Sequence, residues 1–115
     1  MTQTEYLDFH ERLCGLARAL SAAKNTDYAD PDARQHDPLA VFANFCQCAN
    51  LNICTVEQGF LVRLSDKFSR LANLLRVGHE QAVKDESVDD TIKDIINYVV
   101  LLAAYRKAVS RQAEG

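Results

Sequence analysis

Three acidic residues, Glu86, Asp90 and Asp94, follow one another at intervals of four. In a helix this spacing places all three carboxylates on one face, where each pair of like charges costs about 0.2–0.5 kcal/mol. The helix dipole offsets such repulsion only within the first turn, and Asp94 lies about two turns beyond the expected helix start near Ser87. A bound Mg²⁺ or Mn²⁺ would also offset it, because these ions prefer oxygen ligands. The spacing therefore predicts either a divalent-metal site or an acidic helix start that faces solvent.

A basic cluster precedes the acids in the chain. Arg63, Lys67 and Arg70 fall within a sector of about 60° when successive residues are rotated by 100°, and Asp66 lies beside them. Three cations on one face repel one another unless anions lie opposite, and arginine and lysine both bind phosphate oxygens. The cluster indicates a phosphate-binding face. Salt bridges within the helix or to a neighbouring helix would produce the same pattern.

A third polar cluster contains Lys24, Asn25, Asp27 and Tyr28. Lys24 could meet a phosphate, Asn25 a base edge, and Tyr28 could stack on a base. Residues 24–37 lack apolar periodicity, so we expect a loop there, and loops of this length are often functional. Two interpretations stay open: turn-forming residues around one packed tyrosine, or the base of a lid that orders over a nucleotide.

Bulk composition narrows the classes of protein. The 115 residues, 48% hydrophobic and 25% charged, suit one globular domain. A net charge of −3 argues against a partner such as duplex nucleic acid. The longest apolar run, residues 98–105, is too short for a membrane span, and the polar N-terminus is unlike a signal peptide. We therefore expect a cytoplasmic protein with no membrane contact.

Apolar residues recur at intervals of three and four along most of the chain, which predicts an all-α fold. Cap residues mark two helix starts: Asp37 followed by Pro38, and a capping box from Thr55 to Gln58. Gly78 is suited to follow a helix end. We expect helices at residues 4–23, from residue 37 onward, and at 55–77 and 87–111.

The last expected helix is apolar nearly all round after Asp94. Val100, Leu101 and Ala104 lie off its main apolar stripe, where a four-helix monomer offers no obvious partner. We therefore expect a subunit interface there and a homo-oligomer.

Taken in order and spacing, these pieces resemble a small MazG-like family of bacterial and phage proteins associated with nucleotide modification. The resemblance covers residues 24–105. Its segments are Lys24-Asn25-x-Asp27-Tyr28, Phe42-x-Asn44-Phe45, Gly59, Arg63, Asp66-Lys67, Arg70, Asp85-Glu86-Ser87, Asp90-Thr91, Asp94 and Asn97-Tyr98.

The wider superfamily, the all-α nucleoside triphosphate pyrophosphohydrolases, cleaves NTPs or dNTPs to the monophosphate and pyrophosphate. The resemblance thus implies a MazG-like four-helix bundle completed by oligomerisation to a homodimer or homotetramer, and a hydrolase that uses Mg²⁺ or Mn²⁺. Asp94 matches the last metal-binding acid of the family and Asp66 matches an earlier one. Arg63 and Thr91 stand where two further acids are usual, so this chain offers fewer carboxylates.

The clusters and the resemblance together assign the site. Glu86 and Asp90 are the expected catalytic residues, and the metal ligands are Glu86, Asp90, Asp94 and Asp66. The expected substrate-binding residues are Lys24, Asn25, Asp27, Tyr28, Asn44, Arg63, Lys67, Arg70, Asn97 and Tyr98. Three functions agree with this pattern: Mg²⁺-dependent hydrolysis of a nucleoside polyphosphate, nucleotide binding without turnover by a regulator or sequestering protein, and a helical interaction module.

Overall fold

The computed structural model describes residues 1–28, 40–76 and 81–114. These residues contain helices and no strand, so the predicted all-α class is confirmed. The elements are α1 (Gln3–Tyr28), a short 3₁₀ helix η1 (Ala40–Phe42), α3 (Ala43–Asn50), α4 (Val56–Leu74) and α5 (Gln81–Glu114).

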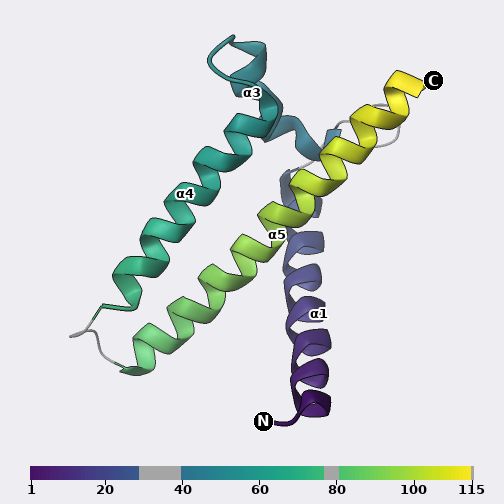
Figure 1. The fold of residues 1–115 in the computed structure, drawn as a ribbon. Coiled ribbons are helices and arrows are strands. Elements are labelled where there is room, and N and C mark those ends of the chain that lie inside the picture. Colours follow the sequence, from purple (N-terminus) through teal and green to yellow (C-terminus); the bar gives the residue numbers. More distant parts are fainter. Residues whose placement is uncertain (29–39, 77–80, 115) are drawn as a thin grey trace.

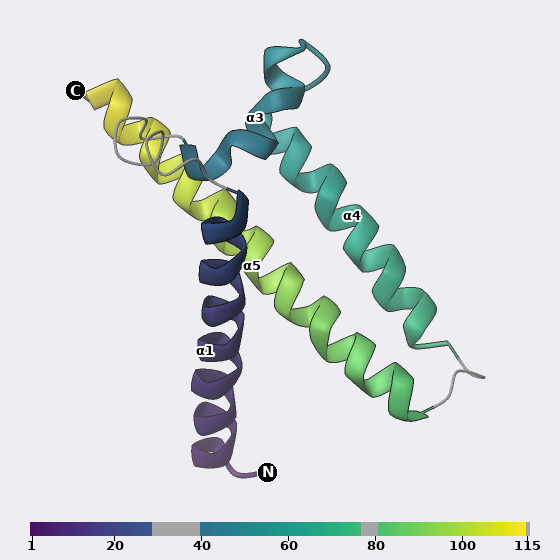
Figure 2. The ribbon, with the colours of Figure 1, turned by 180° about the vertical axis from the view of Figure 1, so that it is seen from behind.

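Helices α4 and α5 run antiparallel and form the longest helix contact in the fold (Figure 1). Helix α3 packs at the N-terminal end of α4. Helix α1 meets α5 with its C-terminal half, whereas its N-terminal half stands clear of the other helices in both views (Figures 1 and 2). No helix among the described residues has the length and apolar content that crossing a membrane requires.

The core lies where α3, α4 and α5 meet. Phe45 and Phe60 stack with their ring centroids 3.9 Å apart, and Phe60 has no exposed surface. Tyr98 of α5 presents its edge to Phe45 at 5.7 Å, and Tyr105 approaches Phe42 in the same way at 5.5 Å. Edge-on aromatic contacts of this kind add about 0.5–1.5 kcal/mol each to the burial of apolar area.

The start of α4 confirms the predicted capping box. The Thr55 hydroxyl accepts a hydrogen bond from the Gln58 backbone N–H at 3.1 Å, and the Gln58 side chain accepts one from the Thr55 N–H at 3.0 Å. These bonds satisfy two donors that a helix start leaves open. Helix α4 ends at Leu74 rather than near Val77, and Gly78 lies outside the described residues.

Helix α1 is longer than we expected. It continues to Tyr28 instead of ending at residue 23, so Lys24, Asn25, Asp27 and Tyr28 belong to a helix and not to a loop. Polar helical turns show no apolar period, which is why the pattern missed them. The rest of the expected lid, and the helix start at Asp37, fall in residues 29–39, outside the described part of the chain.

Helix α5 is also longer, beginning at Gln81 instead of Ser87 and running to Glu114 instead of Arg111. Its acids therefore stand deeper in the helix than we expected. The expectation that Leu101 lacks a partner within the chain is wrong, because it packs against the aromatic core. Val100, on the same turn, remains more than half exposed.

Replacing Phe60 by alanine should lower the free energy of unfolding by about 3–5 kcal/mol, because it leaves a cavity under the stacked Phe45 ring. Urea unfolding at one fixed protein concentration measures the loss. Thr55→Ala, which removes one capping bond, should cost only about 1 kcal/mol. Equal losses in the two variants would contradict this description of the core.

Candidate functional site

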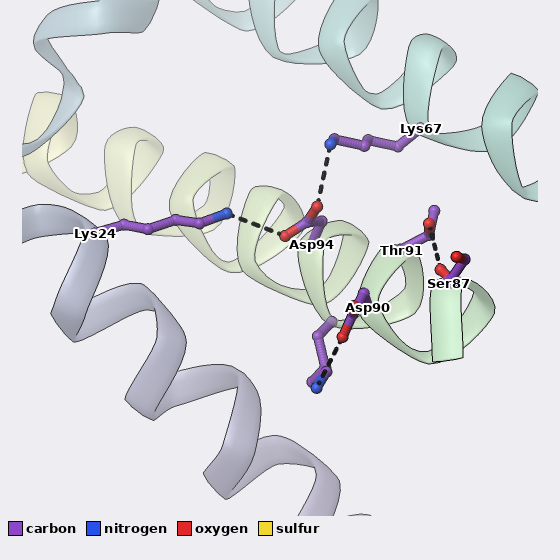
Figure 3. A network of polar contacts seen from close by, with 7 residues as sticks. Lys24, Lys67, Ser87, Asp90, Thr91 and Asp94 are labelled. Carbon is purple, nitrogen blue, oxygen red and sulfur yellow. Dashed lines mark hydrogen bonds and ion pairs between the residues drawn. The ribbon is translucent and has the colours of Figure 1, made fainter. Parts of the chain in front are cut away.

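Three helices meet at one carboxylate. Lys24 of α1 donates to Asp94 Oδ1 at 3.2 Å, and Lys67 of α4 donates to Asp94 Oδ2 at 3.0 Å (Figure 3). Asp94 projects from α5 between the two lysines. Its side chain is only 20% exposed, whereas that of Lys24 is about half exposed. The acidic and basic clusters of the sequence thus share one junction, which we call the lysine–aspartate junction (Lys24, Lys67 and Asp94).

The junction shifts the ionisation of its carboxylate. Partial burial by itself would raise the pKa of Asp94, but hydrogen bonds from Lys67 and Lys24, together with their charges, outweigh it. The pKa of Asp94 therefore lies below its ordinary value of 3.8. Asp94 is ionised at neutral pH, and both of its oxygens are engaged by cations.

The other two acids of the stack do not share this environment. Asp90 is 66% exposed, points away from Lys67 and pairs with Lys93 on its own helix at 3.3 Å (Figure 3). Glu86 is exposed. Among the residues that the structure describes, no three acids, histidines or cysteines are grouped closely enough to hold a metal ion. The metal site stays a prediction, with Asp94 as its one acid at the junction.

Thr91 is the residue that replaces one of the acids usual in the resembled family. It is buried, and its hydroxyl donates to the Ser87 carbonyl at 2.7 Å. Its polar group is thereby satisfied within α5. A hydroxyl held in this way supplies neither a charge nor a general base at neutral pH.

An open pocket of about 500 Å³ lies beside the junction on α4. Lys67 belongs to both, because its side chain lines this pocket and its amine binds Asp94. The lining residues are Asp66, Lys67, Ser69, Arg70, Asn73 and Leu74. The sequence analysis did not assign Ser69, Asn73 or Leu74, although the spacing of Asp66, Arg70 and Asn73 already places them on one helical face.

Other expected substrate-binding residues lie elsewhere. Arg63 stacks over the Phe45 ring at 5.2 Å, a cation–π contact that directs it towards the core. Tyr98 is a core residue through its contact with Phe45. Asn44 is exposed on α3 and Asn97 is half-buried on α5. Arg63 and Tyr98 thus make structural contacts in this fold, and their expected roles in substrate binding stay predictions.

The end of α1 contributes Lys24 to the junction. Asn25, Asp27 and Tyr28 follow within about one helical turn on the same helix. Their side chains lie outside the described part of the structure, so their expected contacts with a base stay predictions.

Comparisons of the chain with models of protein families, with curated proteins and with solved structures find no match.

Asp94→Asn should lower the free energy of unfolding at pH 7 by about 1–2 kcal/mol, because two charge-assisted hydrogen bonds lose their anion. A carboxylate whose folded pKa is depressed stabilises the protein above its ordinary pKa and loses that effect as the pH falls through the folded value. The difference between the variant and the wild type should therefore shrink below about pH 3.8.

Urea unfolding at pH 7 and at pH 3 measures the effect. Asp89→Asn, an exposed acid on the same helix, is the matched control and should change the unfolding free energy by less than about 0.5 kcal/mol. A penalty for Asp94→Asn that is the same at both pH values would contradict an ionic role for Asp94.

Proposed function

We propose that this chain binds the phosphates of a nucleoside polyphosphate at the lysine–aspartate junction and acts as a Mg²⁺-dependent pyrophosphohydrolase-like protein. The observation that carries the proposal is the convergence of Lys24 and Lys67, from two different helices, on the two oxygens of one carboxylate, at 3.2 and 3.0 Å. Two amines already directed at one anion need little further ordering to bind a second anion.

The surrounding charge suits phosphate. Arg70 lines the pocket next to Lys67, and its guanidinium can bind two phosphate oxygens at once. Ser69 and Asn73 add neutral hydrogen-bonding groups along the same wall. A nucleotide whose phosphates reach from the junction into this pocket would meet three cations, Lys24, Lys67 and Arg70.

Without ligand, the two lysines neutralise Asp94. A phosphate oxygen that displaced the carboxylate from them would free both oxygens of Asp94. Asp90, one turn earlier on α5, points away from Lys67 and pairs with Lys93, so it would have to turn towards Asp94 to act as a second carboxylate ligand. One or two carboxylates, with phosphates and water, are the usual protein ligands of Mg²⁺, so this donor set fits an ion that arrives with the nucleotide. Bound there, Mg²⁺ or Mn²⁺ would neutralise phosphate charge during cleavage.

The proposal also assigns the catalytic acids, the cations that contact the phosphoryl group, and the place of the base. Glu86 and Asp90 are exposed to solvent, where a carboxylate can orient an attacking water. Lys67 and Arg70 would stabilise charge on the phosphoryl oxygens in the transition state. The base would lie near Asn25 and Tyr28, on the turn of α1 that follows Lys24.

A second candidate, nucleotide binding without turnover, is favoured by Thr91. The buried hydroxyl that bonds to Ser87 occupies a place where the resembled family carries an acid. Arg63, which stands at the other replaced acid, is directed to Phe45. A site that kept its cations and lost its acids would bind phosphate and turn it over slowly or not at all, as in a regulator or a sequestering protein.

Incubation with a panel of NTPs and dNTPs, with and without Mg²⁺, separates the candidates. Pyrophosphate release indicates the hydrolase, and a raised melting temperature without release indicates the binding protein. Silence in both assays would contradict both candidates and leave the helical interaction module.

Lys24→Met and Lys67→Met should each weaken nucleotide binding about 10- to 100-fold, the loss expected for one charge-assisted bond of about 1.5–3 kcal/mol. Calorimetric titration measures the affinity separately from stability. Lys107→Met removes an exposed lysine near the other end of α5 and should leave the affinity unchanged. If Lys107→Met weakens binding as much as Lys67→Met, the attraction is a general effect of charge and not of the junction.

Asp90→Asn should abolish the binding of Mg²⁺ or Mn²⁺ to the nucleotide complex while leaving stability unchanged or slightly raised, because Asp90 is exposed and repels its neighbouring acids. Calorimetry with nucleotide present gives the metal affinity, with Asp89→Asn as control. Unchanged metal binding in Asp90→Asn would exclude this residue as a ligand.

A further inference from the structure

Two cysteines lie on either side of the turn that joins α3 to α4. Cys48 is in the last turn of α3, and Cys54 directly precedes Thr55, the N-cap of α4. Both are half-buried free thiols, and the proposed function uses neither of them. They come together only if the turn between them reverses the chain.

The turn is closed by two backbone hydrogen bonds. The Ile53 N–H donates to the Cys48 carbonyl at 3.0 Å, and the Asn52 N–H donates to the Ala49 carbonyl at 3.0 Å. Asn52 has a φ of 59°, in the left-handed region that asparagine enters more readily than most residues. These bonds and this conformation form a Schellman motif, which ends a helix in a defined geometry. Cys54 follows Ile53 directly, so the motif brings Cys54 back towards Cys48.

The start of α4 positions the second thiol. Cys54 leads directly into the capping box of Thr55 and Gln58, where the first turn of the helix is hydrogen-bonded. Its sulfur lies beside Gly59, because a Cβ atom added to this glycine would be 3.9 Å from Cys54 Sγ, an ordinary van der Waals distance. Each of the two cysteines is therefore attached to a hydrogen-bonded helix end.

The ionisation of Cys54 reflects how close the two sulfurs are. Desolvation raises the pKa of the Cys54 thiol above its ordinary value of 9.0, and the charge of Cys48 and a hydrogen bond between the two side chains raise it further. Such a hydrogen bond forms only between sulfurs that are close neighbours. The two thiols are thus placed for a reaction with each other.

The other two cysteines have different surroundings. Cys46 packs against the aromatic core, and Cys14 lies on α1 beside His10. Within the described ranges, no third cysteine, histidine or acid joins Cys48 and Cys54 in a group that could hold a metal ion. Because a structural zinc site normally has four ligands, this pair is better suited to a reaction between two thiols.

We propose that Cys48 and Cys54 form an oxidation site, at which a hydroperoxide converts the two thiols to an intrachain disulfide. One thiolate attacks the outer oxygen of the peroxide, so that the O–O bond breaks and a sulfenic acid forms. The departing oxygen takes up a proton and leaves as an alcohol, or as water from hydrogen peroxide. The second sulfur then attacks the sulfenic sulfur, the S–S bond forms, and the hydroxide and the remaining thiol proton leave as water. The two electrons that the sulfurs lose reduce the peroxide.

The oxidation site is separate from the lysine–aspartate junction. Helix α3 and its turn lie at the end of α4 where that helix begins (Figure 1), and Lys67 is about 18 Å farther along the helix axis than Thr55. The proposal therefore does not rest on nucleotide binding. Since the disulfide would join two side chains that are already neighbours, the oxidised chain should keep its helix content, and a loss of helix by circular dichroism would contradict the proposal.

Hydrogen peroxide added to the full chain tests the site. After denaturation and alkylation of the remaining thiols, chymotryptic cleavage after Leu51 separates Cys54 from Cys46 and Cys48. Mass spectrometry should find the two fragments joined, with the alkyl group on Cys46. Cys48→Ser and Cys54→Ser should each leave the chain without an intrachain disulfide, and Cys14→Ser should leave the yield unchanged. A link through Cys46, a link between two chains, or two free thiols would overturn the proposal.

The ratio of the Cys48–Cys54 link to the Cys46–Cys54 link measures what the fold contributes. In the folded chain the first should exceed the second at least 10-fold, whereas in urea both should form in comparable amounts because both rings are short. Asn52→Val disfavours the left-handed φ and should move the ratio towards that in urea, while Asn52→Gly permits this φ and should keep the ratio. Equal ratios in the folded chain and in urea, or a wild-type ratio in Asn52→Val, would show that the turn does not position the thiols.

Discussion

The two ion pairs that Asp94 forms with Lys24 and Lys67 are the interaction on which the arrangement of the helices depends. It joins α1, α4 and α5 through one carboxylate, between residues as far apart in the sequence as Lys24 and Asp94. Because Asp94 is mostly shielded from water, the attraction is less screened than in a surface pair. The lysine–aspartate junction therefore both holds the end of α1 in place and forms the candidate phosphate site. Asp94 thus contributes to stability and to the proposed function.

Outside this junction, the chain has one aromatic core and leaves much of its remaining apolar surface exposed. The aromatic core at Phe45 and Phe60 secures α3, α4 and one part of α5. Beyond it, α1 and the outer side of α4 keep large apolar side chains in contact with water. A small domain has only a few kcal/mol of net stability, so exposed apolar area on this scale is a substantial loss unless a second surface covers it.

Features encoded within a few residues were predicted well from the sequence. The capping box at Thr55 and the helical class depend on local spacing, and both are present among the described residues. The ends of α1 and α5 were not predicted, because their terminal turns are polar and lack an apolar period. The link from Lys24 to Asp94 spans 70 positions, and no local pattern reports such a contact.

The site residues stay predictions. For the basic cluster the sequence left two alternatives open, a phosphate-binding face and salt bridges, and Lys67 does form a salt bridge to Asp94 of the neighbouring helix. The helical face of Arg63 predicted a phosphate contact, but it did not predict the cation–π contact that Arg63 makes with the Phe45 ring of a different helix. The partner of a side chain depends on distances to other helices, and a helical wheel of one helix does not give these distances.

Phosphate binding at the lysine–aspartate junction is tested most directly by NMR of the lysine side-chain amines during titration with a non-hydrolysable nucleoside triphosphate and Mg²⁺. The Nζ signals of Lys24 and Lys67 should move together as phosphate replaces the Asp94 carboxylate, while that of Lys107 should stay in place. Signals of Lys24 and Lys67 that remain unchanged at saturating nucleotide would contradict it.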